Sequence, residues 1–254
     1  MTESRPEIRV CKDAAELARQ AAELFASLAQ ERIHSRGIFT VALSGGSTPK
    51  ALLSLLAEEP FRSRINWSKV HLFWGDERCV PPNHQDSNYR MTREAFLSKA
   101  PIPQENVHRM RGEEQATARA ADEYADILKD FFKLEEGQLP RFDLVLLGMG
   151  DDGHTASLFP GTAALEEKEK LVMANYVEKL NSYRLTLTFP VINNAETIVF
   201  LVAGDNKAAA LKEVIEGERA PSRLPSQSVQ PVNGQLIWMI DEGAARLLIG
   251  QTRL

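Results

Sequence analysis

The chain has 254 residues, of which 43% are hydrophobic and 26% are charged, and its formal net charge is −5. This composition is typical of a globular protein with a sizeable core, arranged as one large or two small domains. No basic run stands out in the sequence, so binding to nucleic acid or to an anionic membrane surface is not expected.

The N-terminal segment lacks the apolar core of a signal peptide, and no stretch approaches the ~18 apolar residues of a membrane span. Cys11 and Cys79 form no CxxC pair and no metal-ligand set with histidines, which favours two free thiols in a reducing compartment. We therefore expect a cytoplasmic protein.

Helical and strand patterns alternate along the chain. Apolar residues at helical spacing predict a long helix over residues 14–33, with Asp13 as its N-cap. The remaining predicted helices cover residues 50–59, 88 onward, 113–132, 206–217 and 242 onward. Strands are predicted over residues 38–43, 70–75, 142–147, 184–189, 197–204 and 235–240. This alternation predicts an α/β fold with an open, mainly parallel sheet that carries helices on both faces.

Four polar or glycine-rich segments follow predicted strands: SGGSTP, GDER, GMGDDGH and GDNK. Ligands of open α/β sheets bind at the carboxyl ends of the strands, where these loops gather. We therefore expect the four segments to form one composite site.

The SGGSTP segment is suited to a phosphate. Gly45 and Gly46 let the backbone approach a ligand closely, and the start of the following helix offers free N–H groups and partial positive charge. Ser47 or Thr48 is predicted to cap this helix, with Pro49 at its first position. A plain capped turn without a ligand is the alternative. The spacing matches neither a P-loop nor a dinucleotide fingerprint.

Three cations accompany this segment. Arg78, in GDER, offers a planar fork of donors, although GDER taken alone favours a surface turn with self-paired charges. Arg184 opens the predicted strand 184–189. Lys207 stands near a helix start, where a cation is unfavourable unless an anion is bound, and the alternative there is a solvated lysine.

His154 is the candidate general base. Asp152 lies two residues before it, and a turn would let its carboxylate fix the imidazole tautomer and stabilise the imidazolium. A histidine without strong neighbours titrates near pH ~6.5, which suits proton transfer. Gly148, Gly150 and Gly153 have N–H groups that suit a developing oxyanion.

Other readings of this loop are less well supported. A capped loop with a satisfied histidine remains open. Ser157 lacks a GxSxG elbow, and no further residues have suitable spacing for a metal site. Together, the loops indicate water or proton chemistry on a small phosphorylated substrate, without a cofactor for hydride transfer.

Four segments resemble the 6-phosphogluconolactonases: VALSGGSTPKALL, LFWGDERCVPPNHQDSNYRM, FDLVLLGMGDDGHTASLFPGT and GDNKAAAL. The resemblance implies a single α/β domain over residues 1–254, similar to glucosamine-6-phosphate deaminase and ribose-5-phosphate isomerase. It implies hydrolysis of 6-phosphoglucono-δ-lactone to 6-phosphogluconate in the oxidative pentose phosphate pathway, with no metal or organic cofactor.

The resemblance also assigns roles within the site. It makes His154 the general base and Asp152 its orienting carboxylate. The candidate residues for binding substrate and phosphate are Gly45, Gly46, Ser47, Thr48, Asp76, Arg78, Gly150, Gly153, Arg184 and Lys207. How the phosphate contacts divide among Arg78, Arg184 and Lys207 is left open, as is the choice between a monomer and a small homo-oligomer.

Two alternatives accompany this expectation. One is an amino-sugar-phosphate deaminase or isomerase, but the deaminases carry an Asn-Glu-Pro where this chain has Leu158-Phe159-Pro160, and a tyrosine in place of Arg78. The other is a non-catalytic sugar-phosphate sensor domain. Such proteins usually carry a DNA-binding helical segment, and this sequence has no basic extension of that kind.

Overall fold

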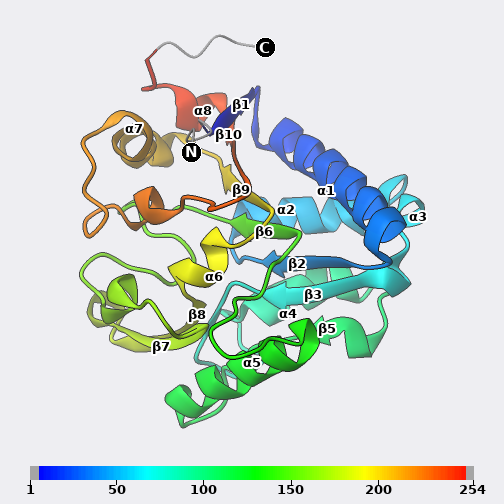
Figure 1. The fold of residues 1–254 in the computed structure, drawn as a ribbon. Helices are drawn as coiled ribbons and strands as arrows, with labels where there is room; N and C mark the ends of the chain where they lie inside the picture. Colours follow the sequence, from blue (N-terminus) through cyan, green and yellow to red (C-terminus); the bar gives the residue numbers. More distant parts are fainter. Residues whose placement is uncertain (1–5, 250–254) are drawn as a thin grey trace.

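The computed structural model describes residues 6–249, and within them seven strands form one sheet in which all neighbours are parallel (Figure 1). Their order across the sheet is β1-β10-β9-β6-β2-β3-β5. The strands are β1 (Glu7–Cys11), β2 (Phe39–Leu43), β3 (Val70–Trp74), β5 (Val107–His108), β6 (Leu144–Leu147), β9 (Thr197–Val202) and β10 (Gln235–Asp241). The predicted open parallel sheet is therefore confirmed.

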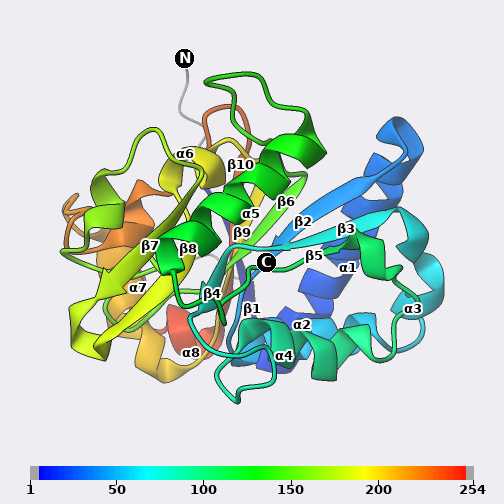
Figure 2. The ribbon, with the colours of Figure 1, turned by 90° about the horizontal axis from the view of Figure 1, so that it is seen from below.

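Helices cover both faces of this sheet (Figures 1 and 2). The α-helices of residues 6–249 are α1 (Ala14–Arg36), α2 (Ser47–Leu56), α3 (Phe61–Arg64), α4 (Asn88–Thr92), α5 (Thr117–Phe132), α6 (Phe189–Asn193), α7 (Ala208–Glu216) and α8 (Glu242–Ala245). Crossovers between parallel strands are right-handed, which places α1 and α2 on one face and α5 on the other. Among the described residues, no helix is long and apolar enough to span a membrane.

A second, antiparallel sheet lies beside α5 and was not expected from the sequence (Figure 2). It consists of β4 (Asp76–Arg78), β8 (Ser182–Leu187) and β7 (Val172–Val177), in the order β4-β8-β7. The predicted strand over residues 184–189 belongs to this sheet, and the expected GDER loop contains β4. This sheet brings two separate parts of the chain to the carboxyl end of the main sheet.

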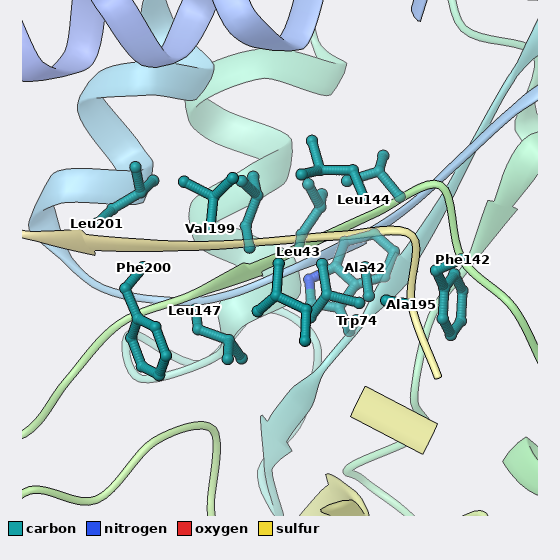
Figure 3. Close-up of a cluster of buried hydrophobic side chains, with 14 of the residues drawn as sticks. Ala42, Leu43, Trp74, Phe142, Leu144, Leu147, Ala195, Val199, Phe200 and Leu201 are labelled. Atoms are coloured by element: carbon teal, nitrogen blue, oxygen red, sulfur yellow. The ribbon is translucent and has the colours of Figure 1, made fainter. Parts of the chain in front are cut away.

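The core explains why the central strands are apolar throughout. Every residue of β2, β6 and β9 is buried, because helices or the small sheet cover both faces. Figure 3 shows Leu43, Leu147, Val199 and Phe200 gathered around these strands. Each of these side chains is at most 1% exposed.

At the start of α1, Asp13 caps the helix by accepting a hydrogen bond of 2.9 Å from the Glu16 N–H, as predicted.

Candidate active site

A pocket of about 240 Å³ lies at the carboxyl ends of β2, β3, β6 and β9, where the four polar segments meet. The expectation of one composite site agrees with this geometry. The pocket is lined by Ser44, Gly45, Gly46, Ser47, Thr48, Pro49, Asp76, Arg78, Asn88, Gly148, Met149, Gly150, His154, Ala156, Leu201, Val202, Ala203 and Lys207.

The start of α2 supplies one side of the pocket. The predicted cap was wrong: the helix begins at Ser47, its N-cap is Gly46, and among the described residues no side chain caps it. The N–H groups of a first helical turn have no acceptor within the helix, so they remain available to an anion. Gly45 is required here because a β-carbon would collide with the Asn88 side chain. The Ser44 hydroxyl is buried without a partner within residues 6–249.

Strand β4 sorts the GDER side chains by the two-residue period of a strand. Asp76 and Arg78 line the pocket, whereas Glu77 is directed to the start of α4. The Glu77 carboxylate accepts the N–H groups of Asn88 at 2.7 Å and Tyr89 at 2.8 Å. This buried carboxylate therefore anchors the loop instead of facing a ligand.

Asp76 is held from two sides. Its Oδ2 accepts a hydrogen bond of 2.7 Å from the Ser157 hydroxyl, and its carbonyl accepts one of 2.9 Å from the Asn88 amide. Asp76 is 6% exposed and Asn88 is 1% exposed, so this hydrogen-bonded pair is a fixed polar part of the pocket wall. Asn88 carries no motif that would single it out in the sequence.

Arg78 and Arg184 lie directly opposite each other on β4 and β8. Arg78 donates to the Asp86 carbonyl at 2.5 Å and lines the pocket. Arg184 does not line it; its guanidinium donates to the Ser182 hydroxyl and the Tyr183 carbonyl. Burial and the neighbouring Arg78 lower the pKa of Arg184. Two adjacent guanidinium groups repel each other, which favours an anion near them.

Lys207 ends the short helix η6 (Asp205–Lys207) that precedes α7. Its ammonium group donates to Asp151 Oδ1 at 2.5 Å, and its side chain lines the pocket. Asp151 is exposed on the surface while Lys207 is only 24% exposed. The Lys207 side chain therefore brings a second positive charge, besides that of Arg78, to the pocket lining.

His154 and Asp152 form the expected pair. The imidazole Nδ1 lies 2.5 Å from Asp152 Oδ1, and the same oxygen accepts the His154 N–H at 3.1 Å. This leaves Nε2 as the ring nitrogen that can take a proton in the pocket. Gly150 is needed because a β-carbon there would overlap the imidazole ring.

The charge of Asp152 is stabilised by two partners. Burial raises its pKa, but hydrogen bonds from His154 and Lys179 outweigh burial and hold that pKa well below its usual range. The lowered pKa keeps the Asp152 carboxylate ionised near neutral pH, so it can stabilise an imidazolium at His154. On its other side, the His154 ring stacks on Phe159, with centroids 3.9 Å apart and planes inclined by 24°.

Most of the predicted site residues come together, and three lie outside the pocket lining. Asp152 stands behind His154, Arg184 stands beside Arg78, and Gly153 packs against Leu224 with its carbonyl bonded to the Ser226 N–H. Ser44 and Met149 belong to predicted segments but were not named as site residues. The sequence did not indicate the lining residues Asn88, Ala156, Leu201, Val202 and Ala203, or Lys179 beside Asp152. Within residues 6–249, no cluster of His, Cys, Asp or Glu could hold a metal ion.

The chain is similar to known proteins in sequence and in fold. A family model described as Glucosamine-6-phosphate isomerases/6-phosphogluconolactonase matches residues 12–238. A Synechocystis sp. protein named 6-phosphogluconolactonase is 46% identical over 216 residues, which cover 85% of this chain and 87% of the relative. The structure entitled 6-phosphogluconolactonase from Trypanosoma cruzi has a TM-score of 0.86 and 30% identity, covering 98% of this chain and 99% of that one.

A monomeric glucosamine-6-phosphate deaminase has a TM-score of 0.79 at 19% identity, covering 95% of this chain and 99% of that one. This likeness extends the shared fold to the deaminases and carries no more than the fold. The family model and the relatives together show that the chain belongs to the glucosamine-6-phosphate isomerase/6-phosphogluconolactonase family.

Proposed function

We propose that this protein hydrolyses 6-phosphoglucono-δ-lactone to 6-phosphogluconate. The observation that carries the proposal is the His154–Asp152 pair, with 2.5 Å between Nδ1 and Oδ1, beside a pocket lined by a helix start and two cations. Relatives named 6-phosphogluconolactonase match almost the whole chain, which supports the same substrate here.

The substrate phosphate binds at the start of α2. The N–H groups of Ser47 and Thr48 lie at the positive end of the helix dipole, and Arg78 and Lys207 line the same pocket. Because Arg184 lies beside Arg78, it reinforces the positive potential without lining the pocket. Fixing the phosphate in this way holds the lactone ring near His154.

Hydrolysis then needs one proton acceptor that later acts as donor. His154 Nε2 takes a proton from water as the water oxygen attacks the lactone carbonyl carbon, and Asp152 stabilises the imidazolium. N–H groups of the 148–153 loop stabilise the tetrahedral oxyanion. When the bond to the ring oxygen breaks, the imidazolium returns its proton to that oxygen, and the product acid ionises in water.

The deaminase alternative is less compatible with this pocket. Phe159 stacks on the imidazole at the position where the deaminases carry a glutamate, so no carboxylate stands there to assist ring opening. A sensor domain would need no oriented base, yet His154 is oriented by Asp152 on one edge and Phe159 on one face. Both observations favour a hydrolase.

The direct test follows acid release from freshly generated 6-phosphogluconolactone and compares it with the uncatalysed rate. We expect fast hydrolysis of the phosphorylated lactone, slow hydrolysis of unphosphorylated gluconolactone, and no ammonia from glucosamine 6-phosphate. Ammonia release, or a lactone rate equal to the spontaneous one, would reject the proposal. A cytoplasmic location and a monomer or small homo-oligomer remain predictions, since some rice relatives are named chloroplastic.

A further inference from the structure

Lys179 completes a ring of four contacting side chains, two of which are the catalytic pair His154 and Asp152. Its ammonium group forms an ion pair with Asp152 Oδ2 and lies 4.6 Å from the centre of the Phe159 ring. Phe159 stacks on His154, and His154 bonds to the other oxygen of Asp152. Each of the four side chains therefore contacts two others in the ring.

The hairpin between β7 and β8 places Lys179 there. Lys179 lies in the single turn η5 (Glu178–Leu180), which connects the two strands. The turn ends at Asn181, which has a positive φ of 45° and accepts a hydrogen bond of 2.6 Å from the Tyr176 hydroxyl. Tyr176 and Tyr183 face each other across the strands with ring centroids 5.1 Å apart. The hairpin tip is therefore braced.

We propose that Lys179 is a positioning residue that holds Asp152 and Phe159 against His154 and favours the neutral imidazole. This inference rests on the hydrolysis proposed above, in which His154 must begin each cycle without a proton. Lys179 is not one of the residues that line the pocket, so its effect passes through its contacts with Asp152 and Phe159.

The two carboxylate oxygens of Asp152 have different partners. One oxygen faces the imidazole and the other faces Lys179, so the carboxylate divides its negative charge between them. A nearby cation disfavours the imidazolium, whereas a carboxylate without that cation stabilises it. Removing the Lys179 charge therefore means that a higher pH is needed to keep His154 neutral.

Other charged groups from neighbouring elements line the pocket with His154 or pair with a residue that does. Asp76 and Arg78 belong to β4, and the Lys207–Asp151 pair joins η6 to the loop after β6. A substitution at Lys179 leaves these four groups in place. A change in the pH dependence can then be assigned to the loss of the Lys179 charge.

Phe159 is the second contact of Lys179. The Phe159 side chain is 6% exposed, and a cation over an aromatic face is attracted by the ring electrons. The Lys179 ammonium, on a side chain that is 51% exposed, lies 4.6 Å from the centre of the Phe159 ring. This attraction helps to hold Phe159 in its stacked position, and the stacked ring limits the rotation of His154.

The test compares Lys179→Met, which keeps the apolar stem without the charge, with Lys179→Arg, which keeps the charge. Lys99→Met is the matched control, because Lys99 is 52% exposed and pairs with Glu58 at 2.8 Å away from the pocket. The kcat and KM for 6-phosphogluconolactone are measured from pH 5 to 9.

For Lys179→Met we expect kcat on the pH plateau to fall about fivefold, with KM within twofold of wild type. The acid limb of kcat/KM should move upward by roughly half to one pH unit. Lys179→Arg should restore most of both effects, and Lys99→Met should show neither. An unmoved acid limb in a folded Lys179→Met protein, or equal losses in the Lys99 control, would overturn the proposal.

A second readout does not depend on turnover. The imidazole C–H proton signals are titrated by NMR, with the His154 signal assigned by its loss in His154→Gln. The midpoint of that signal should rise in Lys179→Met and stay unchanged in Lys99→Met. If the wild-type protein failed to hydrolyse the lactone, the function would be rejected, and this titration would still decide whether Lys179 acts on His154.

Discussion

His154 presents one ring nitrogen to Asp152 and leaves the other for the pocket, so its removal should affect turnover more than binding. General acid–base assistance contributes about 10²–10⁴-fold. We expect His154→Ala to lower kcat for 6-phosphogluconolactone by this factor, because neither water nor the ring oxygen would have a proton partner. Stopped-flow acid release with the spontaneous rate subtracted measures the effect.

The matching control for His154→Ala is affinity for the product. In the proposed binding mode, 6-phosphogluconate is held through its phosphate by the start of α2 and the cations, so calorimetry should give a Kd within a fewfold of wild type. Turnover near the wild-type value in the purified variant would remove His154 from the role of general base.

We expect Lys207 to contribute to binding, because its side chain lines the pocket together with Arg78. A hydrogen bond to a charged group is worth about 1.5–3 kcal/mol, part of which Lys207 already obtains from Asp151. We expect Lys207→Met to raise KM about tenfold while kcat changes little. Steady-state kinetics checks this, with Lys99→Met as the control, and an unchanged KM would place the phosphate elsewhere.

At the scale of single residues, the sequence predicts contacts between residues that are close together in the chain. His154 and Asp152 are separated by one glycine, so their pairing needs only a turn. Lys179 could not be predicted, because its contact with Asp152 depends on a hairpin 27 residues away. The expected cap at Ser47 or Thr48 was wrong, because a capping residue precedes the helix. Both residues already lie in the first turn of α2, and Gly46 is its N-cap.

Among the elements, the pairing of β3 with the edge strand β5 brings two histidines together. His71 Nδ1 lies 3.3 Å from His108 Nε2, and His108 stacks on Phe73 with centroids 4.4 Å apart. Burial, with a smaller effect of His71, lowers the pKa of His108 to about 4. Burial also lowers the pKa of His71. The surroundings of His71 and His108 therefore favour the neutral form of both imidazole rings.

This contact should make the edge of the sheet sensitive to acid. The folded pKa of His108 lies below its unfolded value, so its stability contribution is complete above pH ~6.5 and is lost as pH falls toward 4. We expect the free energy of unfolding of wild type to fall by about 1 kcal/mol more than that of His108→Gln between pH 7.5 and 5, after a discount for solvent exposure. Urea titrations at both pH values measure the difference, and parallel losses in the two proteins would contradict the assignment.

The sequence predicts the strands that are buried on both faces, because all of their residues are apolar. Strands β6 and β9 lie in the middle of the sheet and are apolar throughout, so composition identifies them. Strands β4, β5 and β7 are short or mix buried and exposed residues, because they lie at edges or in the small sheet. Their strand conformation depends on partners far away in the sequence, which a local pattern does not contain.

For the whole molecule, the pocket joins parts of the chain that are separated by up to 163 residues, from Ser44 to Lys207. It includes the start of α2 from one face of the main sheet and β4 from the small sheet. A ligand that contacts both holds the two sheets together, so binding should stabilise the entire fold rather than one loop.

A bound ligand stabilises a folded protein by RT ln(1 + [L]/Kd), which is about 2.7 kcal/mol at 100 times the Kd. For a chain of this size, that free energy corresponds to a rise of roughly 5–10 °C in Tm. We expect 6-phosphogluconate at this concentration to produce such a rise, measured by scanning calorimetry.

Gluconate at the same concentration should produce almost no rise in Tm, because it lacks the phosphate that is proposed to bind α2 and Lys207. In Lys207→Met the shift should shrink at a fixed ligand concentration. Equal shifts with gluconate and 6-phosphogluconate would mean that the pocket does not recognise the phosphate, and the binding mode derived from the α2 helix start would be wrong.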